Sequence, residues 1–462
     1  MTHVNDKADP ITIAYIGGGS REWAWKLMSD LALEESLSGE VRLYDIDYAA
    51  AQDNASIGNR LSSRTDVKGK WNYTAVRSLP EALAGCDFVI ISIFPGTFEE
   101  MASDVHTPEK YGIYQAVGDT VGPGGLVRAL RTVPMYVEIA EGIRDYAPEA
   151  WVINYTNPMT ICTAALYEVF PKIKAFGCCH EVFGTQRLMV SMLAEMLGIE
   201  GVKRNEIKVN VLGINHFTWL DSASYKGLDL FPLYKAFVDK HYEEGFEARG
   251  TEYWKTDIFA AANRVKFDLF RRYGLIAAAG DRHLAEFMPP SYLKDPQTVA
   301  ECKFSLTPVE WRVGHRKEQV LRNQRLAQGE EQVDLKPSGE EGVQQIKALL
   351  GLGELVTNVN LPNQGQMLGL PQGAVVETNA VFSRNSIKPV IAGQLPLGLH
   401  SLVARHVTNQ QTVLQAALTK DKSLAFQAFI NDPLVTLDVK DTESLFQQML
   451  DNTKAYLPGW SI

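Results

Sequence analysis

Short apolar runs alternate with longer amphipathic stretches along the first 200 residues of the chain. The runs are rich in Val, Ile and aromatic residues, and they predict strands at 11–16, 41–44, 87–93, 151–154 and 173–178. Apolar residues at helical spacing predict helices at 21–37, 49–64 and 127–146. This alternation is typical of an α/β fold, here a Rossmann-type parallel sheet with helices on both faces.

The pattern changes after about Gly201. One more strand is predicted at 207–214, followed by helical stretches at 255–273 and 299–328, a turn-rich β-like region at 356–381 and closing helices between 397 and 450. A chain of 462 residues is too long for one ordinary core. We therefore expect a Rossmann-like domain at 1–200 and a mixed α+β domain at 201–462, packed tightly because no flexible linker separates them.

Composition excludes some classes of partner. A net charge of -10 argues against nucleic-acid binding, which needs clustered Lys and Arg. No apolar run approaches the roughly 20 residues that cross a bilayer, and Met1–Pro10 lacks the apolar core of a signal peptide. The five cysteines are few and scattered, unlike a disulfide framework. These features predict a cytoplasmic protein without a membrane partner.

A glycine turn follows the first predicted strand. Its sequence, Gly-Gly-Gly-Ser, leads into a predicted helix, where a dinucleotide pyrophosphate meets the helix N-terminus. Asp45 ends the second predicted strand, where an acid holds the adenosine ribose of NAD, and Asp47 is a second candidate. Glu22 stands where the fingerprint has its third glycine. The predicted NAD contacts are Gly17, Gly19, Ser20 and Asp45. The alternative is a turn in an α/β protein that binds nothing there.

The segment Asn154-Tyr155-Thr156-Asn157-Pro158 ends another predicted strand, at the sheet edge where ligands collect. Lactate and malate dehydrogenases carry a similar strand-then-Asn-Pro element near the nicotinamide, and the whole chain is expected to share their superfold. We therefore expect Asn154 to contact the cofactor and Asn157 the substrate. The alternative is a plain Asn-Pro turn.

Cys179 and His216 follow two further strand ends. A thiolate and an imidazole brought to one edge could bind a borderline divalent metal and leave positions open for substrate. Spacing alone also allows a simply buried cysteine and a core histidine.

An ordered set of short motifs resembles glycoside hydrolase family 4, the glycosidases that need NAD and a divalent metal. The motifs are Gly17–Ser20, Lys110–Gly112, Gly122–Gly125, Arg128–Pro134, Asn154–Pro158, Cys179–Glu181, Asn215–Phe217, Asn360–Asn363, Leu370–Pro371 and Val375–Glu377. The resemblance implies that Cys179 and His216 bind the metal, usually Mn²⁺, and that Asn157 binds the sugar beside it. Asp119 matches the acidic residue that the family has before its Gly-Pro-Gly-Gly segment, and we expect it to bind substrate.

Arginines near these motifs are candidates for binding sugar oxygens or a carboxylate. Arg128 and Arg131 lie three residues apart on one predicted helix face, and Arg282 follows the apolar run 275–279. We expect Arg131 and Arg282 to bind substrate. The alternative for the pair on the helix is a surface ion pair.

The resemblance also implies the substrate. Cys179-His180-Glu181 is similar to the subgroup that acts on α-linked uronic acids, and Phe94-Pro95 replaces the arginine that some phosphoglycosidases carry. We expect an α-galacturonidase, with α-glucuronidase next and α-galactosidase or α-glucosidase as further alternatives. The substrate would be a small uronide or oligogalacturonide, and the family commonly forms homodimers or homotetramers.

The mechanism that the resemblance implies is transient NAD-dependent oxidation at C3, metal-assisted removal of the C2 proton and elimination at C1, with NAD restored in each cycle. Asp281 is the expected base, with Tyr273 and Tyr292 as alternatives, and the expected proton donor is His180 or a water. Asp281 could instead cap a solvated helix. The rival from another class is an NAD-dependent hydroxy-acid dehydrogenase, although the chain has no Gly-x-His-Gly segment.

Overall fold

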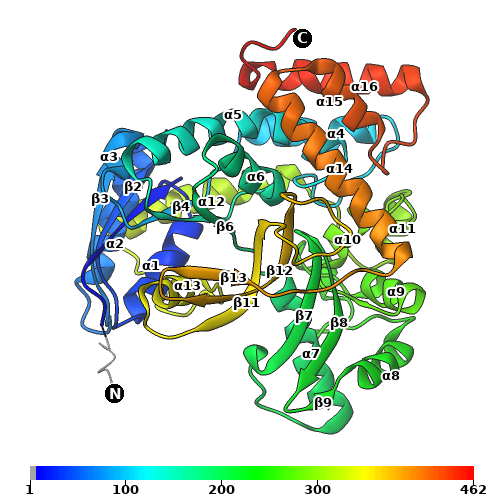
Figure 1. Ribbon diagram of the computed structural model, residues 1–462, viewed down its shortest axis with the longest axis horizontal. Helices are drawn as coiled ribbons and strands as arrows, with labels where there is room; N and C mark the ends of the chain where they lie inside the picture. Colours follow the sequence, from blue (N-terminus) through cyan, green and yellow to red (C-terminus); the bar gives the residue numbers. More distant parts are fainter. Residues whose placement is uncertain (1–6) are drawn as a thin grey trace.

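Two sheets organise the protein, whose computed structural model describes residues 7–462 (Figure 1). Met1–Asp6, part of the polar N-terminal stretch considered above, lie outside the described residues. The larger sheet has nine strands in the order β13-β12-β11-β6-β5-β4-β1-β2-β3. The smaller sheet has the order β10-β8-β7, and β9 pairs with β8.

The larger sheet consists of β1 (Ile11–Ile16), β2 (Ser38–Tyr44), β3 (Lys70–Val76), β4 (Phe88–Ile91), β5 (Trp151–Asn154), β6 (Lys174–Gly177), β11 (Leu355–Pro362), β12 (Val375–Ser383) and β13 (Ser386–Pro389). The smaller sheet consists of β7 (Ile207–Ile214), β8 (Phe217–Tyr225), β9 (Leu228–Asp229) and β10 (Ile276–Ala277).

The helices are α1 (Trp23–Leu33), α2 (Tyr48–Ser62), α3 (Leu79–Leu83), α4 (Phe98–Glu109), α5 (Gly122–Tyr146), α6 (Met159–Val169), α7 (Glu181–Leu197), α8 (Phe231–His241), α9 (Arg264–Tyr273), α10 (Asp281–Phe287), α11 (Pro296–Glu301), α12 (Val309–Gln328), α13 (Gly342–Leu350), α14 (Leu397–Thr419), α15 (Lys422–Ile430) and α16 (Val439–Thr453).

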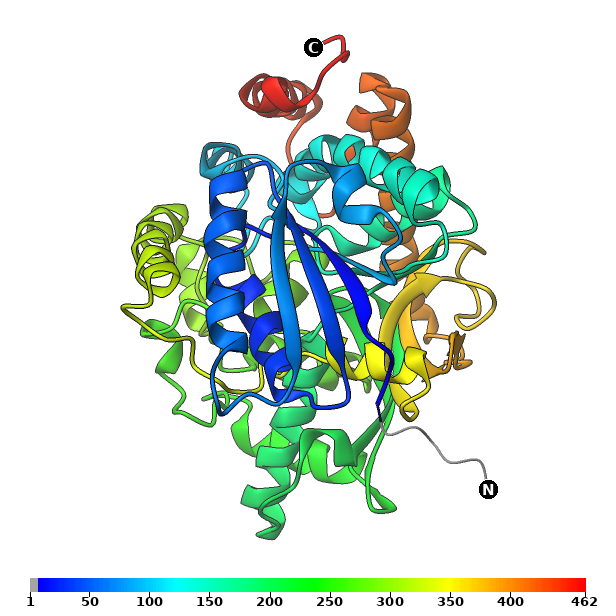
Figure 2. The same cartoon turned by 90° about the vertical axis from the view of Figure 1, so that its left-hand side faces the viewer.

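Strands β1 to β6 pair in parallel and form the expected Rossmann-type sheet, whose N-terminal strands run side by side in Figure 2. Successive residues of β1 point to opposite faces, so Ala14 and Ile16 join one core while Ile13 and Tyr15 join the other. Helices α3, α5 and α6 cover the first face, and α1, α2 and α13 cover the second. The predicted fold class is confirmed.

The larger sheet continues into the second half of the chain. β11 pairs antiparallel with β6 through Asn360 and Gly177, and β12 and β13 extend the sheet outward. The smaller sheet is attached to this extension, since the Asn379 Nδ2 of β12 donates to the carbonyl of Val209 in β7 at 2.6 Å. A division at residue 200 therefore separates the Rossmann-type strands from later strands of the same sheet, and as a domain boundary it stays a prediction.

Three helical predictions were too long, and one of them, 21–37, extends beyond both ends of α1. Residues 255–273 are helical only from Arg264, because Asn263, in the left-handed region with φ 58°, starts a new segment. The predicted stretch 299–328 is divided into α11 and α12, and Pro308 stands directly before α12. Proline disfavours the helical conformation of the residue before it, which explains the break. Strand β8 is missing from the prediction because only two residues separate it from β7.

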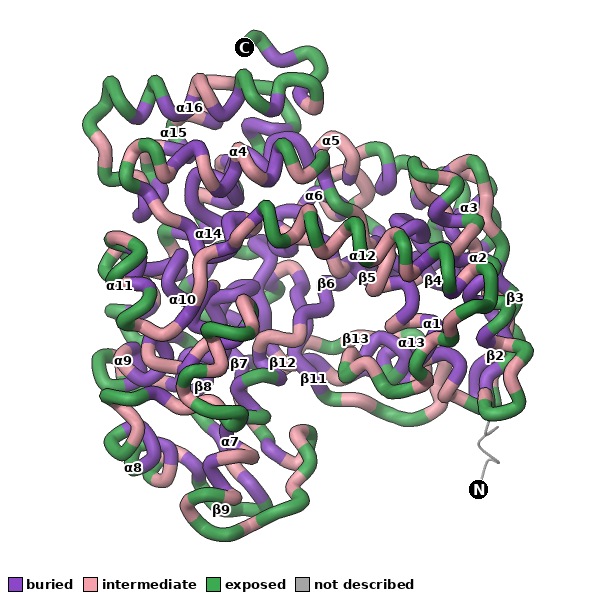
Figure 3. Tube along the Cα trace, turned by 180° about the vertical axis from the view of Figure 1, so that it is seen from behind, coloured by how far each residue is buried: buried purple, intermediate pink, exposed green. Residues whose placement is uncertain are grey.

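Burial follows the layers. In Figure 3, buried positions (purple) gather along the strands of the larger sheet, and exposed positions (green) are frequent along outer helices such as α16. Among the described residues no helix combines the length and apolarity that crossing a bilayer requires.

Candidate active site

The carboxyl ends of the parallel strands meet at one edge of the larger sheet. The register pairs Ile16 with both Tyr44 and Ile91, and Asn154 with both Ile91 and Gly177. The residues that follow these strands therefore lie side by side at the edge where ligands bind in open α/β sheets.

The glycine turn is held at this edge by specific contacts. Gly17 has φ +91°, and a Cβ there would lie 2.0 Å from the carbonyl oxygen of Ser92, so only glycine fits. Gly19 N donates to Asp45 Oδ2 at 2.9 Å, which ties the turn to the predicted ribose-binding acid. Asn54 of α2, fully buried, donates to the carbonyls of Gly18 and Ser20 at 2.8 and 3.0 Å. Asn54 was not predicted.

Free groups around the turn fit a dinucleotide. The Nε of Arg21 is buried and has no partner within residues 7–462, which suits a phosphate oxygen. Asp45 is half-buried and keeps acceptor capacity, while the neighbouring Ile46 is 97% exposed and offers an apolar surface to a base. Asp47, the second acid considered, instead caps α2 through Ala50 N at 3.1 Å. Ser20 N is engaged by the carbonyl of Gly17 at 3.0 Å.

Three side chains form a group that could hold a metal ion. The ligand atoms of Asp119, His216 and His283 all lie within 4.8 Å of one another. His216 stands in the two-residue turn between β7 and β8 with φ 66°, and its ring stacks on that of His283 at 3.7 Å. Thr120 Oγ1 lies 2.9 Å from His216 Nδ1 and donates to Asp119 Oδ1 at 2.7 Å, so one hydroxyl contacts two members.

The charges of this group favour metal binding. Burial, with His283 nearby, lowers the pKa of His216 to about 3, so its imidazole is neutral and its lone pair is available at neutral pH. Burial alone would raise the pKa of Asp119, but His283, Arg128 and His216 hold it well below its usual value. A carboxylate and two neutral imidazoles suit a borderline divalent ion such as Mn²⁺.

The structure brings three of the expected residues together and adds one. Asp119 and His216 share the group, and Asn157 Nδ2 donates to Asp119 Oδ2 at 3.2 Å. The Oδ1 of Asn157 is buried without a partner among the described residues, so it can accept from a ligand hydroxyl. His283 was not predicted, although it lies in the polar segment 280–286 that sequence analysis singled out.

Cys179 is buried beside the group but is not a member of it. Burial and the carboxylates of Glu377 and Glu181 raise the pKa of the Cys179 thiol. Asn215, which directly precedes His216, connects the metal-capable group to one of these carboxylates, because its Nδ2 donates to Glu377 Oε2 at 3.1 Å. A metal role for Cys179 stays a prediction that requires the thiol to lose its proton.

Other predicted site residues are engaged within the protein. Arg131 is fully buried and forms a bidentate ion pair with Asp104 at 2.9 and 2.5 Å. Arg282 donates to the carbonyls of Ser305 and Ala116 at 3.0 and 2.5 Å. Asn154 is fully buried, and its Oδ1 accepts from Tyr136 Oη at 2.5 Å. These contacts engage Arg131, Arg282 and Asn154 within the protein, and the ligand contacts expected of them stay predictions.

The expected base is also engaged elsewhere. Both carboxylate oxygens of Asp281 accept backbone N–H groups at the start of α9, from Val265 at 3.1 Å and from Lys266 at 3.0 Å. Burial raises the pKa of Asp281 to about 6. The alternative given above, that Asp281 caps a solvated helix, describes these contacts better. The helix that it caps is α9, however, and the carboxylate is buried.

The remaining candidates for proton transfer are not members of the metal-capable group, although the charge of His180 acts on both His216 and His283. Tyr292 donates to Asp268, and the ring of Tyr273 packs edge-on against Trp219. His180 pairs through Nδ1 with Glu340 Oε1 at 3.0 Å, and this contact raises the pKa of His180.

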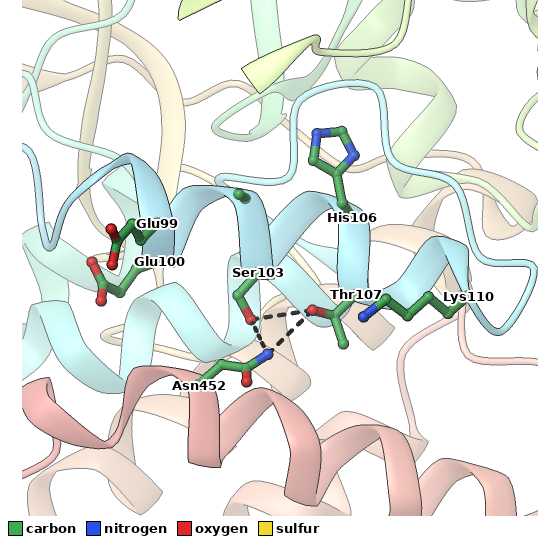
Figure 4. Close-up of a pocket in the computed structure, with 8 residues that line it drawn as sticks. Glu99, Glu100, Ser103, His106, Thr107, Lys110 and Asn452 are labelled. Carbon is green, nitrogen blue, oxygen red and sulfur yellow. Dashed lines mark hydrogen bonds between the residues drawn. The ribbon is translucent and has the colours of Figure 1, made fainter. Parts of the chain in front are cut away.

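A separate hollow between α4 and α16 contains none of these residues. It is lined by Glu99, Glu100, Ala102, Ser103, His106, Thr107, Lys110 and Asn452 (Figure 4). Asn452 Nδ2 donates to Ser103 Oγ at 2.9 Å and to Thr107 Oγ1 at 3.3 Å, which joins the two helices. Its polar groups serve the packing of these helices, and the candidate active site is the sheet edge.

Comparison with known proteins covers both halves of the chain. The family model for the family 4 glycosyl hydrolases matches residues 12–195, and the model for their C-terminal domain matches residues 211–435. An α-galacturonidase of Thermoanaerobacterium saccharolyticum is 64% identical over 463 aligned residues, which cover 100% of both chains.

Solved structures share the architecture. A Bacillus subtilis protein described as a glucosidase is 57% identical, with a TM-score of 0.92 over 96% of this chain and 100% of that one. A 6-phospho-α-glucosidase from gut microorganisms, solved with NAD and Mn²⁺, has the same fold at 20% identity, with a TM-score of 0.81 over 98% of this chain and 100% of that one. Both halves match, so this chain belongs to the family 4 glycosyl hydrolases.

Proposed function

We propose that this protein is an α-galacturonidase that hydrolyses α-linked galacturonides. Its cofactors are NAD and a divalent metal ion, for which Mn²⁺ is the first candidate. The observation that carries the proposal is the 64% identity, over the whole length of both chains, to an α-galacturonidase. The proposal is supported by the Asp119–His216–His283 group, which could hold a metal ion, and by the glycine turn at the carboxyl end of β1. The 6-phospho-α-glucosidase of the same fold was solved with NAD and Mn²⁺.

Bound NAD would supply a hydride acceptor for C3 of the sugar, and a bound metal ion would supply a Lewis acid beside the sugar hydroxyls. Asp119, His216 and His283 would hold the metal. Asn157 Oδ1 would accept a hydrogen bond from a sugar hydroxyl and so orient the ring. Asp45 and Arg21 would hold the ribose and a phosphate of the dinucleotide.

Proton transfer follows a different assignment from the one expected. Because Asp281 uses both oxygens at the start of α9, we propose that it positions α10, and with it His283, and does not act as the base at C2. Asp281 is the first residue of α10, and His283 lies two residues further along.

The activity is tested with a panel of 4-nitrophenyl glycosides in the presence of NAD and Mn²⁺. The proposal expects the highest kcat/KM on the α-galacturonide, above the α-glucuronide, the α-galactoside and the α-glucoside, and loss of turnover when a chelator removes the metal. A higher kcat/KM on any of the three alternatives, or turnover unaffected by chelator, contradicts it.

We further propose that the enzyme works as a homodimer or homotetramer in the cytoplasm. All five cysteines are free, and four are buried, which suits a reducing compartment. Light scattering on the purified protein would test the oligomeric state, and a monomer at assay concentration contradicts this part of the proposal.

A further inference from the structure

Arg312 on α12 is a cation without a partner. Its Nε is buried, and its guanidinium makes no hydrogen bond or ion pair with any residue of 7–462. A buried donor without an acceptor costs free energy, so a group that supplies the acceptor on binding is favoured there.

The surroundings of Arg312 place it at the candidate active site. Burial lowers its pKa, and the neighbouring charges that act on it are Asp119 of the metal-capable group, Arg128 and Glu22 beside the glycine turn. The geometry agrees, because the guanidinium groups of Arg312 and Arg282 approach the same Phe259 ring, and Arg282 directly precedes His283 of the metal-capable group.

Two of the other arginines of the site are less able to bind an anion, and the third adds positive charge. Arg131 is neutralised by Asp104, and Arg282 is bonded to main-chain carbonyls. Arg128 makes one contact, from its Nε to the carbonyl of Asn157 at 3.2 Å. This part of the site carries positive charge that a ligand carboxylate could offset.

We propose that Arg312 binds the C6 carboxylate of the uronide substrate and so determines the preference for uronides over neutral glycosides. The inference rests on the proposed function and names the residue that gives it specificity. A guanidinium presents two parallel N–H groups to a carboxylate, and this charge-assisted geometry rejects a hydroxymethyl group in the same place.

Aromatic side chains complete this binding position. The guanidinium of Arg312 lies 5.3 Å from the centre of the Phe259 ring, and that of Arg282 lies 5.6 Å from the same ring. Phe259 is 53% exposed and packs edge-on against Trp311, which is 42% exposed, at 5.8 Å. The Phe259 ring therefore lies within cation–π distance of Arg312 and helps to hold its guanidinium in place.

The test is calorimetric titration of D-galacturonate into the protein loaded with NAD and Mn²⁺, for the wild type and Arg312→Gln. We expect the affinity for galacturonate to fall about tenfold to 100-fold in the variant, as for the loss of a charge-assisted hydrogen bond. The affinity for NAD, titrated separately, should stay within about twofold. Arg312→Lys should recover part of the galacturonate affinity.

Lys317→Gln is the matched control, because it removes the same charge from an exposed position of the same helix. It should leave galacturonate binding unchanged. Wild-type affinity in Arg312→Gln, or an equal loss of NAD affinity, would overturn the inference. If Arg312→Gln unfolds, Arg312→Lys replaces it in the test. A wild-type galacturonate affinity in Arg312→Lys would then overturn the inference, since lysine lacks the two parallel donors. Failure of the wild type to cleave galacturonides would refute the proposed function, and the titration separates the two results.

Discussion

The buried ion pair between α4 and α5 gives a prediction that separates a structural from a substrate-binding arginine. Arg131 donates to both oxygens of Asp104, and its Nε donates to the carbonyl of Pro95 at 3.0 Å. The side chains are 0% and 1% exposed. Replacing the guanidinium by an apolar group leaves the Asp104 carboxylate buried without its ion-pair partner, with only the more distant positive charge of Arg128 acting on it.

The magnitude follows from that burial. Removing one partner of a buried ion pair costs about 3–5 kcal/mol, because the desolvated charge that remains is no longer compensated. We expect Arg131→Met to lower the free energy of unfolding by that amount. Asp104→Leu combined with Arg131→Met removes both charges, so it should recover much of the loss.

Arg144→Met on the same helix is the control. Arg144 is exposed and pairs only with its exposed neighbour Asp145, so we expect no measurable change in stability. Urea unfolding of the four proteins measures stability, and kcat/KM at a temperature where all are folded measures activity. A stable Arg131→Met with strongly reduced kcat/KM would refute the structural role and restore Arg131 as a substrate ligand.

Four further substitutions test single features. Gly17→Ala places a Cβ 2.0 Å from the carbonyl of Ser92, so NAD affinity in a calorimetric titration should fall; wild-type affinity would refute the turn geometry. Asp281→Asn should lower stability by about 1–2 kcal/mol and leave kcat nearly unchanged, whereas lost turnover in a stable variant would make Asp281 the base. His283→Ala should weaken Mn²⁺ binding at least about tenfold, as loss of a ligand requires, and unchanged affinity would remove it from the metal site. Burial raises the pKa of Asp432 from 3.8 to about 6, so its contribution to stability is present below pH 4 and is lost as the pH rises through 6. The loss in the free energy of unfolding is about 3 kcal/mol. Between pH 4 and pH 7 the stability of Asp432→Asn should therefore rise by that much relative to the stability of the wild type. Curves of stability against pH that run parallel for the two proteins would contradict this.

The fold was predictable where burial imposes a regular pattern. β1 and β5 begin and end at the predicted residues, because strands in the middle of a parallel sheet are buried on both faces and appear as unbroken apolar runs. β7, an antiparallel edge strand of the smaller sheet, also has the predicted bounds, and its second half is fully buried. β3, at the edge of the larger sheet, has exposed positions that alternate with buried ones and was not predicted.

The site was predictable where a residue follows a strand. Asp45 follows β2 and contacts the glycine turn. His216 follows β7 and belongs to the metal-capable group. The partners of Arg131 and Asn154 could not be predicted, because Asp104 and Tyr136 come from other helices whose faces the sequence does not orient. For the same reason His283 and Arg312, which depend on the docking of α10 and α12, were found only in the structure.

The central claim is that NAD is a cofactor that is restored in each cycle of galacturonide hydrolysis. One experiment tests it directly: galacturonate release from 4-nitrophenyl α-galacturonide and NADH absorbance are followed in the same sample with Mn²⁺ and with catalytic NAD. We expect many galacturonate molecules per NAD, with no net rise in NADH and no release when NAD is omitted. Release that proceeds without NAD, or NADH that accumulates in step with consumed substrate, as in a hydroxy-acid dehydrogenase, would contradict the claim.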